Sequence, residues 1–410
     1  MVMKVKFVNP VRNYEMIKDE IDAAYFEVMS KGDLIDRGQL KSFEENLAKF
    51  VGTKYAVGLN SGYDALHLSL RAAGIGPGDE VIVPAHTFVA SCSAIVNVGA
   101  TPVLVDVGKD FNIDCDAIEK AIGDRQSAVS GQRSAVSDRQ SAVGGQRSAI
   151  KAIMVVHLSG YMADMVRIME IAEKYNLVVV EDACQSLGSW MEDTDSVRCQ
   201  VLGVRHEKSV RKMAGAWGLT GCWSFYPFKI LGGYGDGGAI TTNDPDVALY
   251  ATRMRYNGED RDTGEYHGHG FTCLLDNMQA AFLDVKLRYL PKWIVRRKAI
   301  AEKYREALSD LPDLLLPHYD DPRRDHIYQN YTLRSKQGIE FSDFMKANGV
   351  EVLTQFRKPY YKHEALKLED RGFPETEALS REVCSLPMNV EITDDEIDYV
   401  ISVVRKFYGK

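Results

Sequence analysis

Short apolar runs recur through the first 242 residues of the chain, and they constrain its fold more than any other feature. They occupy residues 55–59, 80–84, 101–107, 152–157, 177–180, 222–225 and 239–242. Segments with helical spacing lie between them, such as residues 64–73 and 165–175. Runs that are apolar on both sides and alternate with helices are typical of parallel strands with helices on both faces. We therefore expect an α/β fold with a mostly parallel, doubly wound sheet.

The pattern changes in the last third of the chain. A strongly amphipathic helix is predicted over residues 276–290, and it continues past Pro291 to residue 308. From His326 onward, short strands and helices follow in an order typical of a smaller α+β unit. We therefore expect a large domain over residues 1–257 and a second part over residues 258–410, which holds the bridging helix and a small C-terminal domain.

Two stretches interrupt the alternation of strands and helices. Residues 124–151 repeat SAV or SAI every seven residues, but alanine and valine are adjacent there and not spaced as the core positions of a coiled coil. Residues 191–212 are mildly basic and have no clear period, which favours a solvated face over a nucleic-acid contact. We predict that both stretches are flexible surface insertions.

Composition narrows the classes of function. The 410 residues carry a formal net charge of −8, so we expect no wholesale binding to nucleic acid. No uncharged apolar stretch is long enough to span a membrane, and the start, MVMKVKFVNP, lacks the pattern of a signal peptide. The seven cysteines form no CxxC pair, which favours reduced thiols and a cytoplasmic location over disulfides or a zinc site.

Residues 223–240, WSFYPFKILGGYGDGGAI, present one lysine, Lys229, in a glycine-rich segment between two predicted strands. A lysine amine can form a Schiff base with a carbonyl when its charged form is disfavoured, and flexible backbone lets it move between partners. The alternative is a solvated surface lysine in a hairpin loop, which is the commoner case for such a stretch taken alone.

Several polar residues fall at the predicted strand ends. Ser61, His157, Asp182 and Ser224 each lie there, and ligands of parallel sheets bind at the carboxyl ends of the strands, so we expect a shared site. The turn at residues 60–62 precedes a helix and suits a phosphate, with ordinary helix capping as the alternative. Phe88 opens the next helix, where it either stacks on a flat ligand or belongs to the core.

Six motifs follow one another along the chain: NSGYDAL, PAHTF, HLSGYMADM, EDACQSLG, SFYPFK with GYGDGGAITTND, and LLDNMQAAFL. In this order they resemble the pyridoxal-phosphate-dependent sugar aminotransferases of the DegT/DnrJ/EryC1/StrS group. The resemblance covers residues 32–387 apart from the two insertions. It implies the fold of the aspartate-aminotransferase type, with pyridoxal phosphate bound by the large domain.

The resemblance also implies a role for each matching residue. Lys229 would hold the cofactor as a Schiff base and then carry the proton during transfer of the amino group. Asp182 would pair with the pyridine nitrogen and keep it protonated, which makes the ring an electron sink. The remaining cofactor contacts would be the amides of Gly62 and Tyr63 and the Ser224 hydroxyl on the phosphate, the Phe88 ring against the pyridine ring, and Gln185 on the phenolic oxygen.

Four positions depart from the pattern of the family. Tyr63 stands where the family usually has Thr or Ser, and Thr272 replaces an asparagine that the neighbouring subunit usually contributes, so Thr272 would offer a hydroxyl to the phosphate. Ser159 and Tyr161 differ from the usual HLYGQ pattern in a segment near the substrate.

The activity implied by this resemblance is the transfer of an amino group from L-glutamate to a nucleotide-linked keto-sugar. The family's active sites are shared between subunits, so a homodimer is expected. Two alternatives stay open. One is a sugar dehydratase on the same scaffold, although the best-known such branch replaces the lysine that is present here as Lys229. The other is a non-catalytic regulatory relic, which the two insertions suggest.

Overall fold

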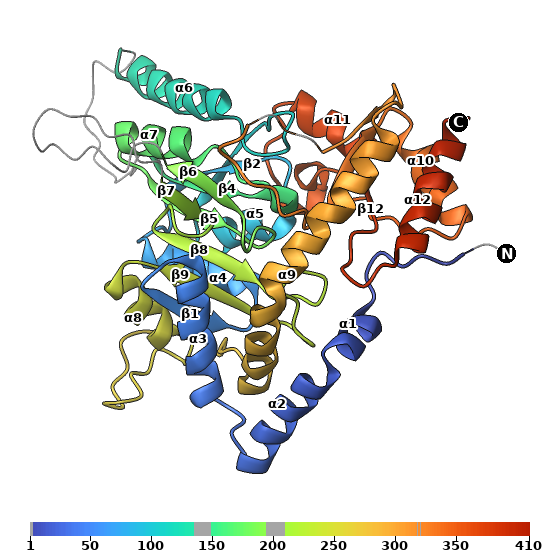
Figure 1. Ribbon diagram of the computed structural model, residues 1–410. Coiled ribbons are helices and arrows are strands. Elements are labelled where there is room, and N and C mark those ends of the chain that lie inside the picture. The colour runs from blue at the N-terminus through green and yellow to red at the C-terminus, as the bar shows by residue number, and fades with distance from the viewer. Residues whose placement is uncertain (1–2, 135–148, 194–209, 318, 320) are drawn as a thin grey trace, which may run out of the picture.

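A seven-stranded sheet forms the centre of the large unit in the computed structural model, which describes residues 3–134, 149–193, 210–317, 319 and 321–410 (Figure 1). The strand order is β1-β9-β8-β5-β4-β2-β3. The strands are β1 (Tyr55–Leu59), β2 (Asp79–Pro84), β3 (Thr101–Val105), β4 (Ala149–Val156), β5 (Val178–Asp182), β8 (Thr220–Ser224) and β9 (Gly238–Thr242). The pairs from β3 through β8 are parallel, and β9 is antiparallel to both β8 and β1. The predicted mostly parallel sheet is thus confirmed.

Helices cover both faces of this sheet, and each face has its own core. One core joins side chains of α3 (Gly38–Val51), α6 (Cys115–Ser134), α7 (Met165–Tyr175) and α9 (Asn277–Leu308). The other joins α4 (Gly62–Ala72), α5 (Val89–Asn97) and α8 (Pro245–Met254). Neighbouring strand residues alternate between the two: Ile82 packs into the first core and Val83 into the second. This alternation explains why the strands are apolar on both sides.

The C-terminal unit is a smaller α+β arrangement. Its three-stranded antiparallel sheet has the order β10 (Leu314–Leu315), β11 (Tyr331–Ser335) and β12 (Val383–Leu386). Three helices accompany it: α10 (Gly338–Ala347), α11 (Pro374–Glu382) and α12 (Asp394–Phe407). Val5 packs into the core of this unit and pairs with Val350, so the start of the chain lies against the C-terminal unit. The division at residue 258 stays a prediction.

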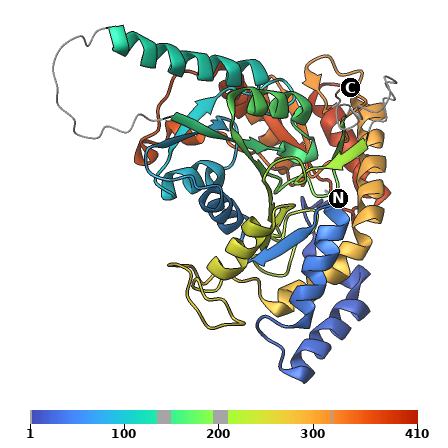
Figure 2. The same cartoon turned by 90° about the vertical axis from the view of Figure 1, so that its left-hand side faces the viewer.

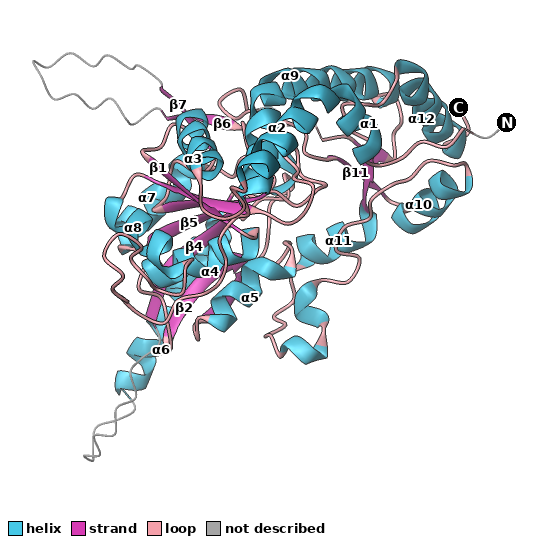
Figure 3. Cartoon of the chain, turned by 90° about the horizontal axis from the view of Figure 1, so that it is seen from below, coloured by secondary structure: helices cyan, strands magenta, loops and turns pink. Residues whose placement is uncertain are grey.

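Two helices, α1 (Pro10–Met16) and α2 (Lys18–Lys31), precede α3 and are separated by one residue. Ile17 lies between them with φ −132° and ψ 26°, outside the helical region. Its side chain is buried against Phe282, Val285 and Trp293 of α9, together with Ile21. Burial of Ile17 against α9 accompanies the break, and α1 and α2 run beside α9 (Figure 3).

Both predicted insertions begin later than expected. Residues 124–134 continue α6, whose end projects from the body of the protein in Figures 1 and 2, so the start of this stretch is a helix and its flexibility stays a prediction. Alanine, arginine and glutamine are good helix formers, which explains a helix without an apolar stripe. Residues 191–193 and 210–212 belong to a hairpin of β6 (Trp190–Asp193) and β7 (Val210–Met213). Residues 135–148 and 194–209 lie outside the described residues.

The described helices include none that is long and apolar enough to cross a membrane.

Candidate active site

Asp182 ends β5 at the carboxyl edge of the sheet, and its carboxylate is nearly buried, with 7% of the residue exposed. The Ser91 hydroxyl on α5 donates a hydrogen bond to Oδ2 over 2.7 Å, and the Cys184 amide donates to Oδ1 over 3.3 Å. Thr87 Oγ1 lies 3.1 Å from Ser91 Oγ. A buried carboxylate needs such partners, because an unpaired charge in the interior is costly. The neighbours therefore hold Asp182 in one orientation.

Three chain segments meet next to Asp182. A side chain at Gly62, the first residue of α4, would place its Cβ only 2.7 Å from Ser224 Cβ and 2.9 Å from Cys184 Sγ. Gly62 is required here by this close approach, since real Cβ atoms do not come so near. The first turn of α4, the end of β8 and the loop after β5 thus form one cradle. The helix turn presents amides without intrahelical partners to it.

Lys229 belongs to the same neighbourhood. Burial raises the pKa of the Cys184 thiol well above its usual range, the Asp182 carboxylate raises it further, and the Lys229 amine lowers it. Both charged groups therefore act on one thiol in the cradle. The Lys229 amide donates to Tyr226 O over 2.8 Å, which places the lysine in a tight turn just after β8. The end of β5, the end of β8 and the first turn of α4 thus lie together, and Lys229 lies in the turn that follows β8.

Two further predicted residues follow the ends of strands β2 and β5. Phe88 is the residue before α5, and 59% of it is exposed, so it is not a core phenylalanine. Its ring remains available to a flat ligand. Gln185 follows Cys184 and accepts a hydrogen bond from the Ser159 amide over 2.8 Å. Ser159 has φ +56°, an uncommon conformation for serine that this contact accompanies.

Other predicted residues are used differently. The Tyr63 hydroxyl accepts a hydrogen bond from Asn97 Nδ2 over 2.5 Å, so it binds the end of helix α5. Thr272 is exposed, and its hydroxyl donates to Asn257 Oδ1 over 3.0 Å. His157 is fully buried, and its Nε2 lies 3.0 Å from a carboxylate oxygen of Glu181. The expectation that His157 shares the site is wrong, because its ring is used in the core.

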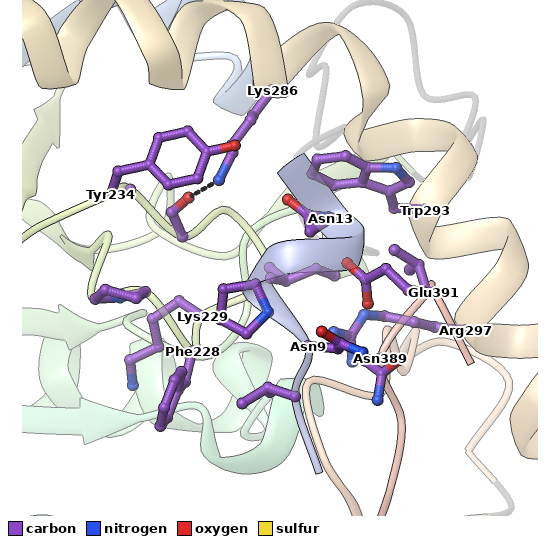
Figure 4. A pocket seen from close by; sticks show the side chains of 17 residues that line it. Asn9, Asn13, Phe228, Lys229, Tyr234, Lys286, Trp293, Arg297, Asn389 and Glu391 are labelled. Carbon is purple, nitrogen blue, oxygen red and sulfur yellow. Dashed lines mark hydrogen bonds between the residues drawn. The ribbon is translucent and has the colours of Figure 1, made fainter. Parts of the chain in front are cut away.

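A separate cavity of about 240 Å³ lies against the loop that carries Lys229. Its charged wall residues include Lys286, Arg297 and Glu391, but neither Asp182 nor Ser224 lines it. Figure 4 shows the Lys229 side chain leading away from the group formed by Asn9, Asn389 and Glu391. The cavity therefore lies on one side of the loop that carries Lys229, and Asp182 and Ser224 are not part of its wall.

Sequence reasoning missed two residues that support the site. Ser91 contacts Asp182, and Gln329 contacts the backbone on both sides of Lys229. Ser91 lies three residues after Phe88 in a helix of ordinary composition, and Gln329 comes from the distant C-terminal unit. Neither carries a local signal, because their partners are 91 and about 100 positions away in the chain.

The donor set fits pyridoxal phosphate and gives no support to a metal. Within the described residues, no group of three or more His, Cys, Asp or Glu side chains could hold a metal ion. The cradle at Gly62 excludes a side chain and leaves helix amides for a phosphate, as at other helix N-termini that bind anions. The buried carboxylate of Asp182 suits a protonated ring nitrogen, and Lys229, in the turn that follows β8, carries an amine that can bind a carbonyl.

Comparison with known proteins agrees with this geometry. The model of the DegT/DnrJ/EryC1/StrS aminotransferase family matches residues 15–405. A dTDP-3-amino-3,4,6-trideoxy-alpha-D-glucose transaminase from Streptomyces venezuelae is 35% identical over 98% of this chain and 96% of that protein. A pleiotropic regulatory protein from Geobacillus stearothermophilus is 33% identical over 99% of both chains.

A solved structure from Bacillus subtilis, NtdA with bound cofactor PMP, has a TM-score of 0.81 and 26% identity, and the match covers 100% of this chain and 86% of that one. The predictions of the fold class, of a sugar aminotransferase and of pyridoxal phosphate as its cofactor are confirmed by these comparisons. The chain belongs to the DegT/DnrJ/EryC1/StrS aminotransferase family.

Proposed function

We propose that the protein converts a nucleotide-linked keto-sugar into an amino-sugar, with L-glutamate as the amino donor. The observation that carries the proposal is the buried carboxylate of Asp182 next to the Gly62 cradle, with Lys229 in the turn that follows β8. The dTDP-sugar transaminase that is 35% identical over nearly the whole chain supports the class of substrate. The donor follows from the resemblance described above.

Asp182 and Lys229 divide the chemistry between them. When bound, pyridoxal phosphate supplies an electrophilic carbon for exchange of amines and a ring that withdraws electrons from the neighbouring C–H bond. Asp182 holds a negative charge, oriented by Ser91, and so retains a proton on the ring nitrogen. Lys229 would hold the cofactor, and its amine would serve as the base and acid that moves the proton during transfer of the amino group.

The other residues bind and orient. The amides of Gly62 and Tyr63 lie in the first turn of α4, where the helix dipole favours a phosphate, and the Ser224 hydroxyl lies next to them. Gln185 is held by the Ser159 amide and is proposed to bond the phenolic oxygen of the ring. The exposed ring of Phe88 is proposed to stack on the cofactor.

The enzyme is further proposed to work as a homodimer in the cytoplasm. Large apolar side chains are exposed along α1, α2 and the next segment: Val11, Met16, Tyr25, Phe26, Met29, Leu34 and Ile35. Several exposed apolar side chains on neighbouring segments favour a protein partner, and a second copy of the chain would cover them. Thr272 would then approach the phosphate of the neighbouring site. The described cysteines are free thiols, which suits a reducing compartment.

A panel of UDP- and dTDP-linked keto-sugars tests the function directly. The purified protein is loaded with pyridoxal phosphate and incubated with each sugar and L-glutamate. We expect formation of 2-oxoglutarate in step with an amino-sugar, measured by coupled assay and by mass spectrometry. Lys229→Ala serves as the control that binds cofactor without turnover.

The alternatives give different results in the same assay. Loss of water from the sugar without consumption of glutamate would indicate a dehydratase. The relative named as a regulatory protein makes a non-catalytic role the second candidate. Absence of both reactions across the panel, in protein that carries cofactor on Lys229, would support that role and contradict the aminotransferase proposal.

A further inference from the structure

Gln329 holds both peptide groups that flank Lys229. This glutamine lies two residues before β11, and only 6% of it is exposed. Its amide nitrogen donates to the carbonyl of Phe228 over 2.9 Å, and its amide oxygen accepts from the Ile230 amide over 2.6 Å. Peptide groups are planar, so two bonds to the planes on either side of one Cα restrict both of its backbone dihedral angles. The direction in which the Lys229 side chain leaves the backbone is therefore restricted by Gln329.

The glutamine is itself held in place. Arg297 on α9 is buried, and its Nη1 donates to the carbonyl of Tyr328 over 2.9 Å and to that of Gln329 over 3.2 Å. On another side the chain packs against Gly160, where an added Cβ would lie 2.8 Å from the Gln329 nitrogen. A rigidly held residue of the C-terminal unit thus contacts the lysine loop of the large unit.

The glycine-rich end of the loop has different supports. Gln279 on α9 accepts from the Tyr234 amide over 3.0 Å, and Lys286 donates to Gly232 O over 2.7 Å. These contacts fix residues 232–234 but not the peptide groups next to Lys229. Two glutamines thus contact this loop from outside it, Gln329 beside Lys229 and Gln279 at Tyr234, five residues beyond the lysine.

We propose that Gln329 is the positioning residue for Lys229, through which the C-terminal unit aims the amine at the reacting carbon. This inference rests on the proposed role of Lys229. A glutamine suits the task because its neutral planar amide donates and accepts at once. A glutamate of the same shape only accepts, so it keeps the bond to Ile230 and loses the one to Phe228. A methionine fills the space and makes neither bond.

The predicted effect falls on proton transfer and not on binding. The residues proposed to bind phosphate and ring lie elsewhere, so affinity for cofactor and sugar persists. Misplacement of a reacting group by about 1 Å slows a reaction on the order of 100-fold. We therefore expect kcat to fall about 10- to 100-fold in Gln329→Met and less in Gln329→Glu, with KM within about threefold of wild type.

The half-reaction with glutamate gives the decisive measurement. Stopped-flow absorbance of the bound cofactor follows the reaction with ordinary glutamate and with glutamate deuterated at Cα, for wild type, Gln329→Glu, Gln329→Met and Gln279→Met. A positioning role predicts a slower half-reaction and a larger isotope effect in the two Gln329 variants. Both changes should be greater in Gln329→Met than in Gln329→Glu. Gln279→Met should behave as wild type, because its loop contact is remote from Lys229.

Three outcomes would overturn the inference. One is a wild-type rate and isotope effect in Gln329→Met, and another is an equal loss in Gln279→Met, which would mean general anchoring of the loop. If circular dichroism finds Gln329→Met unfolded, the rate and the isotope effect of Gln329→Glu decide instead. A wild-type isotope effect in Gln329→Glu is then the third contradicting outcome. Failure of the proposed function has a separate signature, since wild type itself would then give no half-reaction with glutamate.

Discussion

The hydroxyl of Ser91 donates a 2.7 Å hydrogen bond to Oδ2 of Asp182, and both residues are buried at the carboxyl edge of the sheet. A charge-assisted bond of this kind is stronger than one between neutral groups. It joins the start of α5 to the end of β5 and fixes the one carboxylate proposed to face the ring nitrogen of the cofactor.

The first prediction concerns the charge of Asp182. Asp182→Asn keeps the shape of the side chain but removes the negative charge, so the ring nitrogen loses its proton and most of its capacity to withdraw electrons. We expect a normally folded protein with weaker cofactor binding. Its kcat should fall by about three orders of magnitude, on the order of 4 kcal/mol of transition-state stabilisation.

Ser91→Ala is the matched control for this prediction. It leaves the charge in place and removes only the bond that orients it, so its loss should be closer to tenfold, about 1.4 kcal/mol. Steady-state kinetics on both variants separate the effect of the charge of Asp182 from the effect of the orientation of its carboxylate. Activity of Asp182→Asn within a few-fold of wild type would mark Asp182 as an ordinary carboxylate at a strand end.

The strand–helix alternation was predictable from sequence because burial on both faces leaves continuous apolar runs. Asp182, Ser224 and Lys229 could be placed for the same reason, since each follows such a run. Ser91 and Gln329 could not, because each acts on a segment brought near only by the completed fold. Helix α6 continues through residues 124–134 because propensity there does not depend on an apolar stripe. Ile17, at the break between α1 and α2, is buried against α9, a tertiary contact that no local pattern reveals.

The second prediction follows from the continuation of α6. Arg125 Nη2 lies 3.3 Å from Oε1 of Glu80, a residue that is only 5% exposed. Removal of the arginine leaves a buried carboxylate without its cation. Because about a third of Arg125 is exposed, we expect a loss of only about 1–3 kcal/mol in the free energy of unfolding of Arg125→Ala.

Gln126→Ala is the control for that variant, since Gln126 lies next to Arg125 on the same helix and is exposed. Urea unfolding measures both. Equal stability of the two variants would mean that the ion pair contributes nothing to the free energy of unfolding.

The third prediction concerns pH and Lys286, which lines the cavity behind the lysine loop. Burial lowers the pKa of Lys286 from 10.5 to about 8, and Glu391 acts in the opposite direction. Between these two values the unfolded chain binds more protons than the folded one, so this group makes stability rise with pH. Below about pH 7 both states are protonated and the contribution is constant.

Lys286→Met lacks this titration. The unfolding free energy of wild type, relative to the variant, should therefore gain about 2 kcal/mol between pH 8 and pH 10 and stay level between pH 6 and pH 7. Denaturant titrations at these four pH values measure the difference, in which the other titrating groups cancel. Parallel pH profiles for the two proteins would contradict a buried, easily deprotonated Lys286.

The central claim is that Lys229 is the residue to which the cofactor is attached. Borohydride reduces the C=N bond between pyridoxal phosphate and its lysine, and the reduced link survives digestion, so peptide mass spectrometry locates it. The account predicts the added mass on the peptide that contains Lys229, and on no other lysine, in protein loaded with cofactor. Attachment to a different lysine, or no attachment in a loaded sample, would contradict it.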